Sequence, residues 1–290
     1  MRFSTRLRCV LRQHREYLAE FFGTFILLFL GDSVVAMAVL HSATLPGASA
    51  YLTMAIGWAV ALICAMCVTG SISGGHYNPA VTITLAVHRG FPWRKVPGFI
   101  CAQIVGAFAG AALTYAQYRH LLDEYDDGHR QIIGPKGSAG IFTTFRSESV
   151  SNFGAAWNEF VTTAMLVVCV LGCSDPRNTM FPTAKTPALI PNASACILIG
   201  VVMCIGMGSG FGCSLNPARD LGPRIFTSIA GWGYQVFTVQ SYYFWISSVV
   251  PVVGAISGGY IYDMLVFYEQ PLSALTSSSV ATDESAVTEK

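Results

Sequence analysis

Six long apolar stretches constrain the fold of this chain more than any other feature of its sequence. A helix needs about 20 apolar residues to cross the ~30 Å hydrocarbon core of a bilayer. Only 11% of the residues are charged, against about 25% in an average soluble domain. The sequence therefore predicts an all-α membrane protein with six transmembrane helices, at about residues 18–40, 51–70, 97–118, 155–173, 190–209 and 243–268.

A repeated tripeptide, Asn-Pro-Ala, lies between the second and third stretches and again between the fifth and sixth. Asn is a favoured helix N-cap and Pro suits the first helical turn, so each copy predicts the start of a helix. The runs that follow, 81–88 and 220–229, are too short to span a bilayer. We therefore expect two re-entrant half-helices, which begin at Asn78-Pro79-Ala80 and at Asn216-Pro217-Ala218.

The two halves of the chain repeat one pattern. Glu20 lies 58 residues before Asn78, and Glu159 lies 57 residues before Asn216. Each half holds three spans and one half-helix, and because three is odd the second half enters the membrane from the opposite side. Such inverted repeats place their solute site at the midplane where the halves meet. The half-helices should meet there N-terminus to N-terminus, with their positive dipole ends and the two Asn amides at the centre of a pore.

Basic residues predict the orientation of the chain. Five Arg residues crowd the first fifteen positions, and the turns near 89–95 and 177–185 are also basic. The positive-inside rule places these segments and both termini in the cytoplasm. The expected organisation is a basic cytoplasmic N-terminus at 1–17, a channel domain at 18–268 with repeats at about 18–118 and 155–268, an extracellular loop at 119–152, and a disordered cytoplasmic tail at 269–290.

Composition and spacing argue against several other classes of protein. A net charge of +1 gives no reason to expect a nucleic-acid partner. The nine cysteines lie almost entirely in apolar runs, so a disulfide framework is not expected. The six histidines do not cluster, and no nucleotide-binding loop or nucleophile constellation is present. We expect no catalytic activity, no cofactor and no metal.

The run from 216 to 224, Asn-Pro-Ala-Arg-Asp-Leu-Gly-Pro-Arg, resembles the aquaporins of the major intrinsic protein family, and among them the aquaglyceroporin branch. Asp220, directly after Arg219, is typical of that branch. The resemblance covers roughly residues 16–268. It implies an aquaporin-like fold and a passive channel for glycerol, water and other small neutral solutes. It also implies a homotetramer in the plasma membrane, in contact with the lipid bilayer, with single-file conduction and proton exclusion at the paired motifs.

The resemblance further implies an outer constriction. Arg219 is an arginine within the membrane, which is a functional hypothesis by default. Trp58, twenty residues before Asn78, falls at the position of an aromatic partner. The other two positions correspond to Cys213 and, by spacing, to Cys204. The best-known bacterial member has an aromatic where Cys213 stands, so we expect a wider opening, which would admit urea or small acids, and block by mercurials through Cys213.

Four residues are expected to support the re-entrant loops. Glu20 and Glu159 are carboxylates in apolar spans, where they are costly unless hydrogen-bonded, so we expect them to accept backbone N–H groups of the loops. Asp220 lies at a half-helix N-terminus, which stabilises negative charge. His76 either anchors its loop or lines the cytoplasmic half of the pore and senses pH. Ser247 and Ser248 stand where the branch often has Pro-Leu.

Three other interpretations remain open from the sequence. A secondary transporter shares inverted repeats and broken helices, but it would normally carry ionisable coupling residues at the midplane, where this chain offers Asn. A membrane enzyme would need a reactive constellation. A structural, junction-forming protein with little flux would share the whole pattern. Osmotic swelling of vesicles separates these alternatives.

Overall fold

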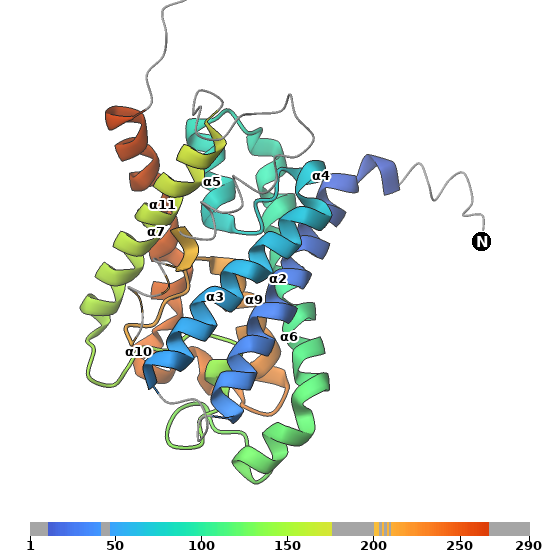
Figure 1. The fold of residues 1–290 in the computed structure, drawn as a ribbon, viewed down its shortest axis with the longest axis vertical. Coiled ribbons are helices and arrows are strands. Elements are labelled where there is room, and N and C mark those ends of the chain that lie inside the picture. The colour runs from blue at the N-terminus through green and yellow to red at the C-terminus, as the bar shows by residue number, and fades with distance from the viewer. Residues whose placement is uncertain are drawn as a thin grey trace, which may run out of the picture.

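The computed structural model describes residues 11–41, 47–175, 200–202, 205, 208 and 210–266 of the 290-residue chain. Within these residues every regular element is helical, apart from one isolated bridge between Gln131 and Gly137. Figure 1 shows the long helices packed side by side along the length of the molecule. The predicted all-α class is confirmed.

Five of the described helical segments are long and apolar enough to cross a membrane, and they match five of the six predicted spans. The fifth predicted span, 190–209, lies almost entirely outside the described residues, although Gly200–Val202 and Ile205 are helical. Two of the segments are single helices, Arg15–Leu40 (α2) and Asn152–Ser174 (α7). The segment Ser49–Ser73 is made of α3 (Gly47–Ala65), η1 (Met66–Gly70) and α4 (Ser71–Ser73). The segment Trp93–Asp126 is made of η2 (Trp93–Lys95) and α6 (Val96–Asp126), and Val239–Leu265 of α10 (Val239–Tyr242) and α11 (Phe244–Leu265).

The two half-helices form where the tripeptides predict them. Helix α5 runs over Pro79–His88 and helix α9 over Pro217–Ile229, each with Pro in its first turn and Asn as its N-cap. At ~1.5 Å per residue, neither reaches across a ~30 Å hydrocarbon core. Figure 1 shows α5 near the upper end of the bundle and α9 closer to its middle, so the two short helices occupy different levels along its length.

Helix α6 is longer than expected, because it continues to Asp126 rather than ending near 118. Five of the eight added residues are charged or histidine, so the hydropathy of the sequence does not extend the span over them: Arg119, His120, Asp123, Glu124 and Asp126. An i,i+4 ion pair between Arg119 and Asp123 and the burial of Leu122 support this extension. The segment between α6 and α7 is correspondingly shorter, and it contains the short 3-10 helix η3 (Ala139–Ile141).

Helix packing repeats between the two halves through matched glycines. A Cβ atom on Gly106 of α6 would lie 2.3 Å from the carbonyl oxygen of Phe21 in α2. A Cβ atom on Gly254 of α11 would lie 2.4 Å from the carbonyl oxygen of Phe160 in α7. Only glycine permits such a close approach of two helix backbones. The first and third spans of each half therefore pack by the same contact.

Candidate functional site

The two Asn side chains bind across the junction of the half-helices. The Nδ2 of Asn78 donates to the carbonyl oxygen of Leu215 at 2.8 Å, and the Nδ2 of Asn216 donates to the carbonyl oxygen of Tyr77 at 2.8 Å. Each Oδ1 accepts from the first turn of its own half-helix, from Ala80 N at 2.8 Å in the first copy and from Ala218 N at 3.0 Å in the second. The structure thus brings the two tripeptides together at one point.

The residues before each Asn share a strained backbone. Tyr77 has φ 47° and Leu215 has φ 58°, a left-handed conformation that is uncommon for non-glycine residues. Both are buried. This conformation turns each carbonyl oxygen toward the Asn of the opposite loop, so the strain accompanies the reciprocal contact.

Glu20 of α2 binds the first loop. Its Oε1 accepts from His76 N at 3.0 Å and from Ser73 Oγ at 2.6 Å. Its Oε2 accepts from Tyr77 N at 2.7 Å and from Gln103 Nε2 at 2.7 Å. Four donors thus surround a fully buried carboxylate, which offsets much of its desolvation cost.

Glu159 of α7 binds the second loop in the same way. Its Oε1 accepts from Ser214 N at 2.5 Å and its Oε2 accepts from Leu215 N at 3.1 Å. It is fully buried as well. The two carboxylates therefore bind equivalent backbone N–H groups, those of the two residues that precede each Asn.

His76 contacts its own half-helix and also lines the central cavity. Its Nδ1 lies 3.1 Å from Thr82 Oγ1, which also receives Gln103 Nε2 at 2.9 Å. Its ring packs against Phe91 and Phe99, with centroids 4.8 and 5.0 Å away. The same residue lines the central cavity. His76 is thus both anchored within its loop and adjacent to the cavity.

A cavity of about 190 Å³ runs past the meeting point of the loops. Apolar side chains from the spanning helices line it together with residues of the two loops, including both Asn residues. It extends from Ser174 near one end of α7 to Arg219. Within the described ranges, no three His, Cys, Asp or Glu side chains gather in an arrangement that could hold a metal ion.

Arg219, Trp58 and Cys213 all line this cavity. The Arg219 guanidinium lies over the Trp58 ring, 4.5 Å from its centroid, and its NH1 donates to the carbonyl oxygen of Phe142 at 2.7 Å. Gly31 of α2 permits this arrangement, because a Cβ atom there would lie 2.3 Å from the Trp58 ring. Cys204, the fourth expected residue of the constriction, lies outside the described residues.

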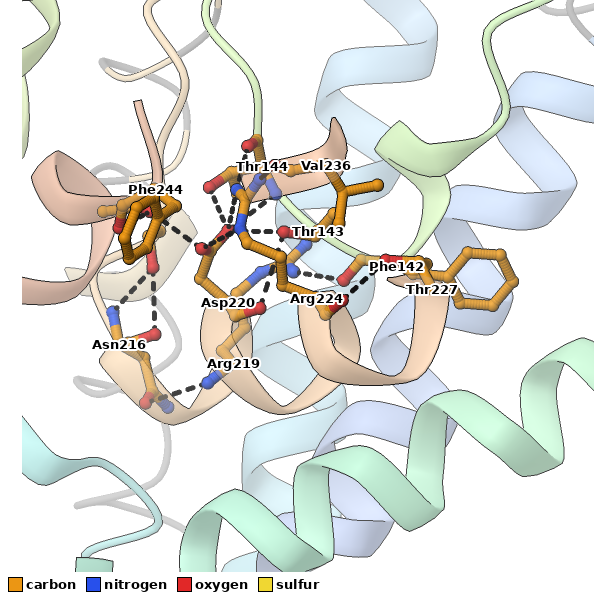
Figure 2. A network of polar contacts seen from close by, with 12 residues as sticks. Phe142, Thr143, Thr144, Asn216, Arg219, Asp220, Arg224, Thr227, Val236 and Phe244 are labelled. Carbon is orange, nitrogen blue, oxygen red and sulfur yellow. Dashed lines mark hydrogen bonds and ion pairs between the residues drawn. The ribbon is translucent and has the colours of Figure 1, made fainter. Parts of the chain in front are cut away.

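Asp220 anchors the start of α9 in a buried polar network (Figure 2). It pairs with Arg224, whose Nε lies 2.9 Å from Asp220 Oδ2, and both side chains are fully buried. Such a pair is stable only when its remaining hydrogen-bonding groups are satisfied. Here they are met by Thr143 Oγ1, Thr144 N, Thr144 Oγ1 and Ser247 Oγ on Asp220, and by the carbonyl oxygens of Val236 and Thr144 on Arg224.

The sequence interpretation missed several polar residues of this site. Gln103 bridges Glu20 and Thr82, and Thr144 joins Asp220 to Arg224. Asp32 in α2 is fully buried, its two carboxyl oxygens have no hydrogen-bond partner among the described residues, and Arg219 attracts it electrostatically. A carboxylate or amide within an apolar span is the signal that could have indicated Gln103 and Asp32.

Comparison with known proteins identifies the family of this fold. The family described as Major intrinsic protein matches residues 9–262. The chain belongs to the major intrinsic protein family. It is 44% identical over 257 residues to Aquaporin-2 of Rhizopus delemar, covering 88% of this chain and 77% of that protein. It is 41% identical over 253 residues to Aquaglyceroporin-3 of Trypanosoma brucei brucei, covering 87% of this chain and 79% of that protein.

A solved structure agrees with these relatives. The X-ray structure of the aquaglyceroporin from Plasmodium falciparum superimposes with a TM-score of 0.73 at 32% identity, covering 87% of this chain and 96% of that one. The predicted resemblance to the aquaporins and their aquaglyceroporin branch is confirmed. As a major intrinsic protein, the chain is a multi-pass membrane channel for water and small solutes, and it is not an enzyme.

Proposed function

We propose that this major intrinsic protein conducts glycerol, water and other small neutral solutes in single file across the plasma membrane. The observation that carries the proposal is the cavity that joins Arg219 and Trp58 to the two Asn residues. Apolar side chains suit the carbon side of a polyol, while loop groups and the guanidinium offer hydrogen bonds to its hydroxyls. A passive channel needs no ionisable coupling residue at the meeting point of the loops, and Asn78 and Asn216 are neutral.

The paired half-helices account for proton exclusion in this proposal. Their positive ends and the amide groups of Asn78 and Asn216 converge on one stretch of the cavity. The positive electrostatic potential of the helix ends opposes the passage of protons and other cations, and the amides interrupt a chain of hydrogen-bonded water. Arg219 adds a positive charge farther along the cavity.

Solute size is set by the constriction in the same proposal. Cys213 is small, so we propose that the opening admits urea and small uncharged acids in addition to glycerol. Replacement of Cys213 by Phe should narrow it and reduce flux of a five-carbon polyol more than flux of glycerol. We further propose that both termini are cytoplasmic and that the channel is a homotetramer. Apolar side chains exposed on the bundle surface, such as Leu52, Ile56 and Val60, are compatible with lipid and subunit contacts.

Osmotic swelling of proteoliposomes that contain the full chain tests this proposal. Wild-type vesicles should swell rapidly in glycerol and urea but not in an impermeant sugar. Flux should rise linearly with solute concentration and should not respond to an imposed proton gradient. Saturation or proton coupling would indicate a transporter, and absence of flux would favour a structural role.

A further inference from the structure

Three consecutive residues before α11 have a left-handed backbone. Gln240, Ser241 and Tyr242 have φ angles of 57°, 57° and 61°. Non-glycine residues seldom adopt this region even singly, and three in succession add their strain. Strain of this kind persists only where surrounding contacts over-determine it. Here the contacts of Gln240 hold the strained backbone in place.

The carboxamide of Gln240 binds both backbone groups of Arg146, 94 residues earlier. Its Oε1 accepts from Arg146 N at 3.1 Å, and its Nε2 donates to Arg146 O at 2.7 Å. Asn152 closes the contact, since its Nδ2 donates to the Gln240 carbonyl oxygen at 3.2 Å and its Oδ1 accepts from Arg146 Nε at 2.5 Å. We call this set of three residues, Gln240, Arg146 and Asn152, the Gln240 clasp.

The clasp holds one end of the segment 142–147, whose other end contacts the constriction. The carbonyl oxygen of Phe142 accepts from Arg219 NH1 at 2.7 Å. Thr144 accepts from Arg224 through its carbonyl oxygen and donates to Asp220 through its N–H. A shift of this segment along its length would therefore move the acceptor that orients Arg219.

We propose that Gln240 is a positioning residue of the constriction. Its carboxamide fixes the register of segment 142–147, so that the Phe142 carbonyl holds the Arg219 guanidinium over Trp58. The left-handed backbone directs the carboxamide toward Arg146. This inference rests on the proposed function of Arg219 in the constriction.

The test compares Gln240→Leu with Gln235→Leu in proteoliposomes of the full chain. The leucine at 240 keeps a similar volume but makes neither hydrogen bond. Gln235 is an exposed residue of the same type in η4 (Tyr234–Phe237), and its carboxamide has no hydrogen-bond partner among the described residues. With Arg219 displaced, the ratio of methylammonium to glycerol flux should rise about fivefold in Gln240→Leu, as expected for a loss of about 1 kcal/mol of discrimination. It should stay at the wild-type ratio in Gln235→Leu.

A second readout does not depend on solute flux. The rate at which a small cationic thiol reagent labels Cys213, measured by mass spectrometry of the labelled peptide, should change about threefold or more in Gln240→Leu. Wild-type flux ratio and labelling rate in a folded Gln240→Leu would overturn the proposal, as would equal changes in both variants. If the wild type passed no glycerol, the proposed function would fail, while the labelling rate would still decide whether Gln240 positions the constriction.

Discussion

Ser247 Oγ lies 2.8 Å from Asp220 Oδ2, and this contact ties the first turns of α11 to the start of the half-helix α9. Ser247 Oγ also lies 2.9 Å from the Phe244 carbonyl oxygen. Ser247 thus contributes a hydroxyl donor to the buried Asp220–Arg224 network.

Replacement of Ser247 by Ala should destabilise the channel. The change removes a donor from a fully buried carboxylate, which costs about 1–3 kcal/mol of the free energy of unfolding. Ser248→Ala is the matched control, because the buried Ser248 Oγ has no hydrogen-bond partner among the described residues. Thermal unfolding in detergent measures both variants. Equal midpoints for the two variants would contradict a role for the Ser247 contact.

Glu159→Gln should weaken the second re-entrant loop. Glutamine keeps the volume of the side chain but replaces one oxygen by an NH₂ group, which cannot accept from Ser214 N or Leu215 N. One buried N–H then loses its acceptor, at a cost of about 1–3 kcal/mol. The midpoint temperature of thermal unfolding and the glycerol flux per folded channel should both fall. Glu148→Gln, in the exposed loop before α7, should leave both unchanged.

Mercurials should block solute flux through Cys213. This thiol lines the cavity together with Arg219 and Trp58, so a bound mercurial fills the constriction. Cys213→Ser should conduct and resist the reagent in stopped-flow swelling assays. Cys101→Ser, which changes an exposed thiol of α6, should remain fully sensitive. Full block of Cys213→Ser would exclude this residue as the site of action.

Arg219→Val should admit small cations. Removal of a charge near the pore lowers the electrostatic barrier, since two unit charges 4 Å apart interact by about 4 kcal/mol at an effective dielectric constant of 20. Ammonium flux should therefore rise by about tenfold or more, while glycerol still passes. Arg219→Lys keeps the charge and should retain most of the exclusion. Vesicle acidification assays distinguish the two variants, and equal ammonium flux would contradict the electrostatic explanation.

The sequence predicted the elements that depend on local patterns. Apolar length located five described spans, and the Asn-Pro-Ala copies located the starts of α5 and α9 at Pro79 and Pro217. The polar end of α6 was missed, because hydropathy does not reveal a helix that continues into water. Such an extension depends on contacts such as the burial of Leu122.

The parts of the site that depend on distant contacts were less accessible from sequence. The pairing of Glu20 with one loop and Glu159 with the other followed from the repeat. The reciprocal contacts of the Asn side chains with Tyr77 and Leu215 did not, because they require two loops to meet in space. Segment 142–147 carries no local signal for its contact with Arg219, since its contribution there is a backbone carbonyl.

Asp32→Val should stabilise the protein. A fully buried carboxyl without a hydrogen-bond partner among the described residues carries a desolvation cost that an apolar side chain of similar shape avoids. Because the attraction of Arg219 offsets only part of this cost, the free energy of unfolding should rise by about 1–3 kcal/mol. Asp32→Asn keeps a polar group at the same place and should gain less. Thermal unfolding in detergent compares the three proteins, and a lower midpoint for Asp32→Val would show that the carboxyl stabilises the constriction rather than burdening it.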